Sequence, residues 1–452
     1  MNTLLVYPPC GFISKNVINM PLGVCSLKSY LVKNGQDATV LDLNMKTYID
    51  SENKELWADD CKTVWSSADG FKETILPKLD ITKMLEHILS RNADIIGFSI
   101  NNSTEYISVI LTKEIKKKSK KTIIFGGPGC YDINAEKFLR AGVDAIAIGE
   151  GEGTLLEFVQ ERKLCKGIYM LHDDKVVYGG SRKPLDIDTL PFPDYDDIVD
   201  DYLKFSPEMG AVSASFVRGC TNRCSFCNES PFWGKVRQRS PENIVNELKY
   251  LKQRYHMQFF NKADSTLAIS ADSLNKICDL IIESNLNVKW HSQARPEKWL
   301  TPELLRKVYQ AGCVHVHYGV ESGSQKILDL MKKNLNVKVM KQVIKDTDEA
   351  GIKASLFIIV DSPKETLIDF IKTVLFLFKL RKHIENYEVS KAGVSYRTDW
   401  FLNPGKYGII DTNPWHTKYY LNNHIAAKLK KGFLDKIKRP ILKKTESNRN
   451  NY

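Results

Sequence analysis

The sequence predicts an α/β protein with two parallel-sheet domains joined by a short linker. Short apolar runs alternate with helical patterns over residues 1–162, the alternation resumes after residue 210, and turn residues cluster in between. With 452 residues, 43% of them apolar, the chain can build more than one core. We expect a flavodoxin-like (Rossmann-like) doubly wound domain followed by a partial, TIM-like (β/α)6 barrel.

The first domain, residues 1–162, is expected to contain five strand–helix units. Its predicted strands span Leu4–Tyr7, Ala38–Leu43, Ile95–Ile100, Thr122–Phe125 and Ala145–Ile148. Gly35 follows the first predicted helix, at a position where a left-handed residue commonly ends a helix. Ligands of such domains bind at the carboxyl ends of the strands. Functional residues are therefore expected at those ends.

Residues 163–209 are expected to form a hairpin and a linker, because they contain paired turn signals and the run Leu-Pro-Phe-Pro-Asp. The second domain is predicted over residues 210–394. Its predicted strands span Ser213–Val217, Gln258–Asn261, Val288–His291, Val314–Gly319, Ser355–Val360 and Val389–Val394. Residues 395–452 are expected to be an extension that is first aromatic and then basic.

Charge and hydropathy limit the classes of partner. The net charge is +11, and residues 424–444 supply +7 of it, with eight Lys/Arg against one Asp. The remaining chain is only mildly basic, so we expect no nucleic-acid partner. No apolar run reaches the roughly 18 residues that span a bilayer, and the first residues have no secretory pattern. We expect a cytoplasmic protein.

The basic tail has an amphipathic helical pattern. Its apolar residues recur at every fourth position, at Ile425, Leu429, Phe433, Ile437 and Ile441. Such a helix either lies on a membrane surface or packs against its own barrel. The first interpretation predicts a peripheral membrane contact, and the sequence leaves both open.

Three cysteines form the most specific motif. Cys220, Cys224 and Cys227 have the spacing C-x-x-x-C-x-x-C directly after the first predicted barrel strand. Three thiolates can hold three irons of a 4Fe-4S cluster and leave the fourth iron open to another ligand. The alternative is a closed zinc site, but this needs four ligands, and neither His256 nor Cys278 has a convincing spacing.

This motif, with Phe226 before its last cysteine, resembles that of the radical S-adenosylmethionine (SAM) superfamily. The resemblance implies that the open iron binds SAM and that its one-electron reduction yields a 5′-deoxyadenosyl radical. It also implies an electron donor such as a flavodoxin or a ferredoxin. Phe226 is then a cofactor-binding residue.

The resemblance also implies SAM contacts at the ends of later strands. It places Asp264 near the methionine amino group, Ser292 and Arg295 near the ribose and carboxylate, and Gly319 and Glu321 near the adenosyl group. Each could otherwise be an ordinary loop residue. Their shared position at strand ends favours a site.

Two further features of the barrel are notable. His315 and His317 are two residues apart, so they share a strand face with Gly319 and Glu321. We interpret both as packed, hydrogen-bonded histidines, with metal ligands or bases as the alternative.

After the fifth strand, many relatives have a G-x-P-G-E-T turn. Residues 361–366 here read Asp-Ser-Pro-Lys-Glu-Thr, without either glycine.

The order of a doubly wound domain, a Leu-Pro-Phe-Pro-Asp linker and this barrel is similar to the cobalamin-binding class (class B) of the superfamily, over about residues 3–375. The resemblance implies that cobalamin contacts Ser99, Gly126, Gly127, Gly129, Gly149, Glu150 and Gly151. No histidine precedes His87 and no D-x-H-x-x-G loop is present, so base-off cobalamin without a histidine ligand is expected. A flavin or dinucleotide site, or a relic that binds nothing, is the alternative.

Together these features predict a cobalamin-dependent radical SAM methyltransferase acting on an unactivated carbon of a small-molecule, lipid or peptide substrate. The resemblance implies that one SAM methylates cobalamin and another provides the radical. One alternative is a radical cyclisation, oxidation or rearrangement without methyl transfer. Another is a non-catalytic iron–sulfur or zinc module that binds RNA or a membrane through its tail.

Overall fold

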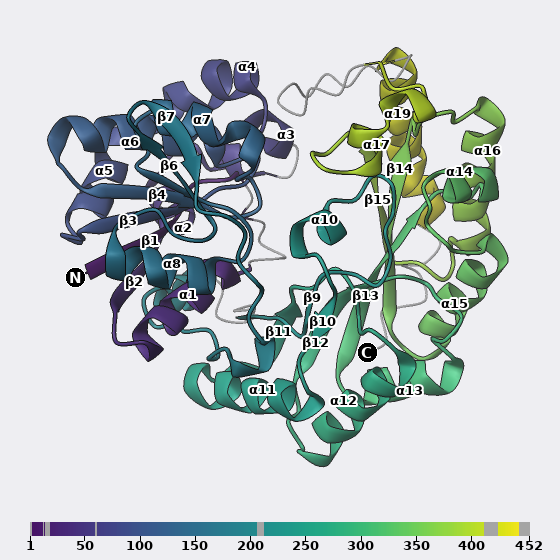
Figure 1. The fold of residues 1–452 in the computed structure, drawn as a ribbon. Coiled ribbons are helices and arrows are strands. Elements are labelled where there is room, and N and C mark those ends of the chain that lie inside the picture. Colours follow the sequence, from purple (N-terminus) through teal and green to yellow (C-terminus); the bar gives the residue numbers. More distant parts are fainter. Residues whose placement is uncertain are drawn as a thin grey trace. The chain divides into compact units, whose positions relative to one another are not determined.

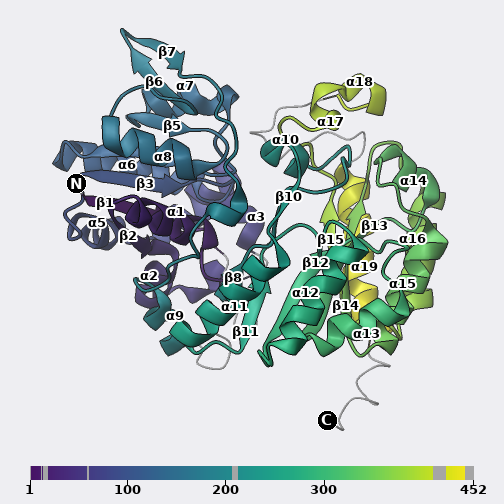
Figure 2. The same ribbon diagram turned by 60° about the horizontal axis from the view of Figure 1, so that its bottom comes forward.

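The chain divides into two compact units, residues 1–213 and 214–452, which are seen in Figure 1 and, turned by 60°, in Figure 2. The computed structural model describes residues 2–11, 13, 19–58, 61–205, 212–410 and 424–442. None of the helices within these ranges is long and apolar enough to cross a membrane.

The first unit is built on a seven-stranded sheet in the order β2-β1-β3-β4-β5-β6-β7. Its strands are β1 (Asn2–Tyr7), β2 (Asp37–Asp42), β3 (Ile95–Ser99), β4 (Thr122–Gly126), β5 (Ala145–Ala147), β6 (Ile168–His172) and β7 (Lys175–Tyr178). Neighbours from β2 to β5 are parallel, whereas β6 and β7 extend the sheet antiparallel. The first five strands have the flavodoxin order, which confirms the predicted class.

Helices cover both faces of this sheet. They are α1 (Leu22–Lys33), α2 (Leu43–Asp50), α5 (Ile81–Leu89), α6 (Glu105–Lys118), α7 (Asp132–Arg140), α8 (Gly151–Glu161) and α9 (Val199–Phe205), with short turns including α3 (Lys62–Trp65) and α4 (Ala68–Gly70) between α2 and α5. Helices α1 and α8 are neighbours, as are α5 and α6, and right-handed crossovers place the two pairs on opposite faces. The fully buried Leu4 and Val6 of β1 lie in the core between them.

The segment after β7 packs back onto this unit. The buried Lys28 of α1 forms ion pairs with Asp194 (3.0 Å) and Asp197 (2.7 Å), and Asp197 also accepts a hydrogen bond from the Val40 backbone. Ser29 donates to the Phe192 carbonyl oxygen. The Leu-Pro-Phe-Pro-Asp run is thus held against α1 and β2.

The second unit is built on a six-stranded sheet in the order β15-β14-β13-β12-β11-β8. Its strands are β8 (Val212–Ala214), β11 (Phe259–Lys262), β12 (Lys289–Ala294), β13 (Cys313–Glu321), β14 (Lys353–Val360) and β15 (Asn386–Lys391). The neighbours from β11 to β15 are all parallel. The six predicted strands are therefore present, in chain order across the sheet, as a partial barrel requires.

The first predicted barrel strand, Ser213–Val217, is broken in two. Strand β8 ends at Ala214, and Val217–Arg218 form β9, which pairs antiparallel with β10 (Arg237–Gln238). The break arises because the Asp264 carboxylate accepts hydrogen bonds from the Phe216 and Val217 backbone amides. These amides therefore do not continue the sheet.

Helices follow the strands of this unit. They are α10 (Glu229–Trp233), α11 (Pro241–Tyr255), α12 (Ala271–Glu283), α13 (Pro302–Gln310), α14 (Gln325–Leu330), α15 (Val337–Glu349) and α16 (Leu367–Leu380). Ser240 and Thr301 cap α11 and α13, and each is followed by a proline at the first helical position. These local signals explain why the helix starts are readable in the sequence.

Strand β13 separates the lumen of the barrel from its outer layer. Val316, Tyr318 and Val320 are fully buried, and the Tyr318 hydroxyl is 2.8 Å from the Thr347 hydroxyl of α15. Side chains alternate along a strand, so His315, His317 and Gly319 face the opposite way and remain partly exposed. They line the lumen.

The C-terminal extension forms α17 (Asp399–Leu402), α18 (Pro404–Tyr407) and α19 (His424–Leu442). Helix α19 lies beside β15, where the Tyr387 hydroxyl donates to the carbonyl oxygen of the buried Leu434. Trp400 and Tyr407 join a hydrophobic cluster, and the Trp400 ring is 5.7 Å from that of Phe226. The extension is thus part of the barrel unit and supports the cysteine loop.

Replacing Trp400 tests this support. Trp400 is 1% exposed and its indole N–H has no hydrogen-bond partner among the described residues. We expect Trp400→Ala to lower the free energy of unfolding by about 3–5 kcal/mol because it leaves a cavity, and Trp400→Phe by less than about 1.5 kcal/mol. Anaerobic denaturant unfolding measures both. Equal losses in the two variants would contradict the packing role.

Candidate functional site

The cysteine loop, residues 220–227, is anchored on the turn that follows α14. The Ser225 amide donates to the Met331 carbonyl (2.8 Å), and the Asn222 side-chain amide donates to the carbonyls of Lys332 (3.1 Å) and Lys333 (3.3 Å). On its other side the loop accepts a hydrogen bond from the Trp400 amide at Ser225 (3.0 Å). The backbone that presents the three cysteines is therefore held from two directions.

The supporting turn has an unusual backbone. Lys332 and Asn334 both have left-handed conformations, with φ of 51° and 53°. Such residues cost roughly 1–2 kcal/mol each outside glycine. The hydrogen bonds of Asn222 and Ser225 to this turn offset the strain. The turn is thus shaped to meet the cysteine loop.

Two cations lie beside the cysteines. Arg295, 7% exposed, donates to the Lys333 carbonyl (2.6 Å) and Glu297 (2.5 Å), and one of its nitrogens is 3.8 Å from the Cys224 sulfur. Lys333 pairs with Glu321 at 2.7 Å, and its Nζ is 5.8 Å from the centre of the Phe226 ring. Burial opposes the charge of Lys333, but Glu321 and Cys224 outweigh this effect and raise its pKa. Lys333 is therefore a buried cation.

Strand β13 bulges to form this ion pair. Its register with β14 shifts between Gly319 and Glu321, and Glu321 has a φ of 63°. A Cβ atom at Gly319 would lie 2.9 Å from both the Glu321 carboxylate and the Lys333 ammonium. Gly319 therefore makes room for the ion pair. The nearby Ser292 is 1% exposed and donates to the Gln293 carbonyl at 3.0 Å.

The donor set of the cysteine loop suits a cluster with one thiolate per iron. All three thiols are partly exposed, and Cys224 accepts a hydrogen bond from the Asn222 side-chain amide at 3.0 Å. Burial raises the pKa of the Cys227 thiol to about 12, so iron would have to displace its proton. Within the described ranges, no three His, Cys, Asp or Glu side chains lie close enough to hold a single metal ion together.

Asp264 ends β11 as predicted, but its own chain surrounds it. Its carboxylate accepts from the Ser215 hydroxyl (2.7 Å), the Phe216 amide (2.8 Å) and the Val217 amide (3.0 Å). It also pairs with Lys262 at 2.6 Å. A carboxylate has about four lone-pair sites, so an incoming amino group would have to replace one of these donors. A role in SAM binding stays a prediction.

Three histidines cluster around a stacked pair in the lumen, and we call this group the histidine stack. The rings of His315 and His317 are stacked at 4.4 Å, and the ring of His291 in β12 meets that of His317 edge to face at 6.0 Å. His315 shares a hydrogen bond of 2.8 Å with Ser355, as predicted, whereas the Nδ1 atom of His317 has no partner in the described structure. Burial and then the neighbouring imidazoles lower the pKa of His291 to about 4 and of His315 to about 3. His291 and His315 are therefore neutral at neutral pH.

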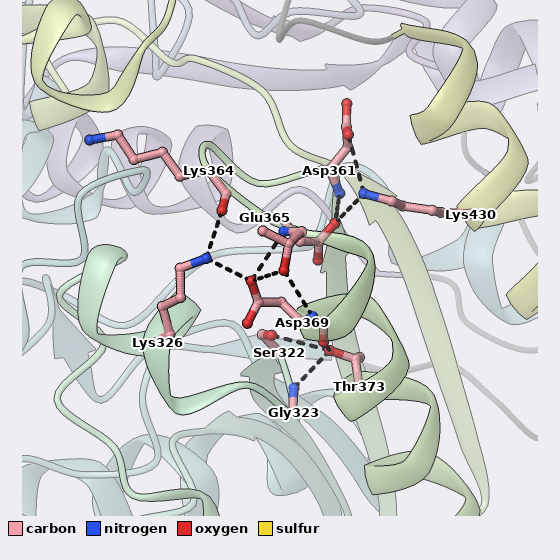
Figure 3. A network of polar contacts seen from close by, with 10 residues as sticks. Ser322, Gly323, Lys326, Asp361, Lys364, Glu365, Asp369, Thr373 and Lys430 are labelled. Carbon is pink, nitrogen blue, oxygen red and sulfur yellow. Dashed lines mark hydrogen bonds and ion pairs between the residues drawn. The ribbon is translucent and has the colours of Figure 1, made fainter.

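The turn after β14 keeps the backbone of a glycine-rich turn without its glycines. Asp361 and Lys364 occupy left-handed positions, with φ of 61° and 62°. Figure 3 shows that Lys430 of α19 reaches this turn and pairs with Asp361 (3.5 Å) and Glu365 (2.8 Å). Glu365 also accepts from the Asp361 amide at 2.8 Å. The C-terminal helix thus holds the turn in place.

The first unit brings its glycines to one edge of the sheet. Ser99 and Gly126 end β3 and β4, Gly149 and Glu150 lie between β5 and α8, and Gly151 begins α8. A Cβ atom at Gly149 would meet nothing within 4 Å, and one at Gly126 would meet only Ala147, at 3.5 Å or more. These two positions leave space for a ligand.

Other glycines at this edge serve packing. A Cβ atom at Gly127 would lie 2.8 Å from the Ile100 carbonyl oxygen, and one at Gly129 would lie 2.9 Å from the Asn101 Cα. The loops after β3 and β4 therefore pack directly on each other. Close approach of a ligand at these two glycines stays a prediction.

Comparison with known proteins identifies the class. Residues 214–377 match the radical SAM superfamily. An uncharacterised methyltransferase of Pyrococcus horikoshii is 25% identical and covers 97% of this chain and 93% of its own length. The anaerobic magnesium-protoporphyrin IX monomethyl ester cyclase of Rubrivivax gelatinosus is 30% identical over half of this chain, which spans only 42% of the cyclase.

Solved structures agree on the fold. The cobalamin-dependent SAM radical enzyme OxsB matches 96% of this chain with a TM-score of 0.73 and 16% identity, and this match covers 67% of OxsB. The radical SAM methyltransferase TsrM of Kitasatospora setae matches 88% of this chain and 76% of its own length, with a TM-score of 0.65 and 17% identity. Residues 214–377 are thus a radical SAM domain, and the chain has the fold of these two enzymes.

Sequence reasoning singled out the three cysteines, Arg295 and Glu321, but it did not single out Lys333, which lies among them in the structure. The structure brings Arg295, Glu321 and Phe226 together around this lysine, as its contacts show. In the sequence, Lys333 is marked only by a run of two lysines and an asparagine after a helix. Such a run is usually a solvated surface turn, so it could not be singled out.

The charge of Lys333 should set the reduction potential of a cluster on the cysteine loop. We expect Lys333→Met to make the potential more negative by an amount on the order of tens of millivolts, because a nearby cation favours the reduced form. A redox titration followed by EPR measures the shift.

Two further variants separate charge from structure. Lys326→Met removes a lysine that pairs with Asp369 instead, and should leave the potential unchanged. Lys333→Met combined with Glu321→Gln removes both charges of the pair and should restore most of the potential. An equal shift in Lys326→Met would refute the local effect.

The lowered pKa values of the histidine stack predict how stability depends on pH. Unfolded histidines titrate near 6.5, whereas His315 in the folded chain titrates at about 3. Between these values the unfolded chain binds more protons, so stability falls as the pH drops below about 6.5. We expect His315→Gln to reduce the loss of stability between about pH 7 and about pH 5 in urea unfolding. His172→Gln, at a site 79% exposed, should not change it.

Proposed function

We propose that this chain is a cobalamin-dependent radical SAM methyltransferase that methylates an unactivated carbon. The observation that carries the proposal is a fold match along 96% of the chain to OxsB, together with a three-cysteine loop directly after the first barrel strands. The Pyrococcus relative, named a methyltransferase, matches along nearly the whole chain. A cytidylyl-2-hydroxyethylphosphonate methyltransferase of Streptomyces wedmorensis is 24% identical and covers 76% of the chain.

Cys220, Cys224 and Cys227 are the ligands we propose for a 4Fe-4S cluster, which supplies the electron for cleaving SAM. Asn222 and Arg295 donate toward the Cys224 sulfur. We propose that Arg295 also pairs with the carboxylate of SAM, beside Ser292 and Gly319. The neutral imidazoles of His291 and His315 offer polar groups to a substrate in the lumen.

Cobalamin, which supplies the methyl group, would bind at the edge formed by Ser99, Gly126 and Gly149. We propose the base-off form without a histidine ligand. His87 is in the last turn of α5, which leads into β3, so it lies at the opposite, amino edge of the sheet. His172 ends β6, which is antiparallel to β5, and therefore lies at the amino edge too. Neither histidine can reach a ligand at the carboxyl edge.

A radical reaction without methyl transfer is the second candidate. It is favoured by the 30% identity with the Rubrivivax cyclase, which is restricted to half of the chain. The mass of the product distinguishes the two, because methylation adds one CH₂ group and also releases S-adenosylhomocysteine.

Cysteine variants test the cluster assignment. We expect Cys224→Ala to abolish 5′-deoxyadenosine formation by the anaerobically reduced enzyme, because two thiolates cannot hold the cluster with one iron open. Cys278→Ala is the matched control, since Cys278 is a fully buried core residue of α12 and should retain activity. Continued cleavage by Cys224→Ala would rule out the assignment.

Metal content then tests whether the protein binds both an iron–sulfur cluster and cobalamin. Protein purified without oxygen from cells supplied with cobalamin should contain about four irons and stoichiometric cobalt, with a base-off absorption spectrum. Iron without cobalt would leave a radical SAM enzyme and remove the methyl-transfer proposal.

A further inference from the structure

Helix α16 has an apolar face that the described residues of its unit leave uncovered. Five of its large apolar side chains are exposed, namely Leu367 (67%), Ile368 (66%), Ile371 (46%), Leu375 (51%) and Phe378 (51%). Among the described residues, 17 large apolar side chains are exposed, so this single helix carries a large share of them. A contiguous apolar surface of this kind usually marks a binding surface.

The five residues form one stripe. At 3.6 residues per turn they fall within an arc of about 100° of the helix. The opposite face, with Phe370, Phe376, Leu377 and Leu380, is buried against the barrel. Helix α16 is therefore apolar on two sides, and packing within the unit explains only one of them.

Helix α19 carries two more exposed apolar residues. Its Leu429 is 68% exposed and its Phe433 is 48% exposed. The Phe433 ring lies 6.2 Å from that of Phe370, which is near the start of α16 on its buried face. Lys430 fixes this part of α19 to Glu365, two residues before α16 begins (Figure 3). We term the seven exposed apolar residues of α16 and α19 the apolar ridge.

Cations surround the ridge. Within residues 364–382 and 428–436, the exposed charged residues are Lys364, Lys372, Lys379, Lys382, Lys428 and Lys436 against Asp435. The acidic side chains of this region turn inward, because Glu365 pairs with Lys430 and Asp369 with Lys326. The outer surface thus combines exposed apolar side chains with an excess of positive charge.

We propose that the apolar ridge docks on an anionic membrane surface. Apolar side chains flanked by lysines match the two attractions that hold a helix at such a surface, burial in the acyl boundary and pairing with anionic headgroups. A second copy of this chain fits less well, because a twofold contact would bring the same lysines face to face. This inference does not depend on the reaction, so it can fail while the proposed function stands.

The test is co-sedimentation of the full chain with vesicles of phosphatidylcholine and phosphatidylglycerol. We expect Ile368→Ser with Leu375→Ser to weaken binding at least about tenfold, because two apolar anchors are lost. Both residues are exposed, so the variant should fold normally. Ile269→Ser with Ile282→Ser is the matched control, since these residues are 40% and 38% exposed elsewhere in the same unit, and should bind as the wild type does.

Other outcomes would overturn the proposal. The first is that the wild-type chain does not bind the vesicles, and the second is that it binds vesicles of phosphatidylcholine alone equally well. The third is that the control variant loses as much binding as the ridge variant. Sedimentation velocity measures the oligomeric state in addition. A wild-type dimer that the Ile368→Ser with Leu375→Ser variant converts to a monomer would assign the ridge to a second copy.

Discussion

The turn after α14 is the constraint on which the site depends. Carbonyls of consecutive residues in this turn accept hydrogen bonds from the cysteine loop and from Arg295. Because Lys332 and Asn334 are left-handed, the chain adopts this shape only where other parts of the fold hold it. The cysteine loop, Arg295 and the turn therefore depend on one another.

Electrostatics follow from this arrangement. The same turn delivers Lys333 to Glu321 and toward the cysteines, so a buried cation lies where thiolates and a reducible cluster would gather negative charge. The histidines of the lumen are different, because burial keeps His291 and His315 neutral. A buried ion pair thus lies at the cysteine end of the barrel, and neutral imidazoles line part of the lumen.

Local signals in the sequence were sufficient for much of the fold. Alternating apolar runs located strands of both sheets, and the caps that the structure shows at Ser240 and Thr301 are local features of the chain. The break after β8 was not predictable. The apolar run at Phe216 and Val217 looks like a continuing strand, and only the distant Asp264 carboxylate removes its amides from the sheet.

The sequence by itself determined the chemistry of this protein, since the spacing of Cys220, Cys224 and Cys227 and the order of the two sheets are properties of the chain. The tertiary structure decided which groups act beside that motif. Lys333 is more than 100 residues from Cys224, and Trp400 lies further still, so no periodicity or spacing links them to it. The tertiary structure also decided which face of α16 the barrel covers and which face is exposed. Both faces of α16 are apolar in sequence, and only packing distinguishes them.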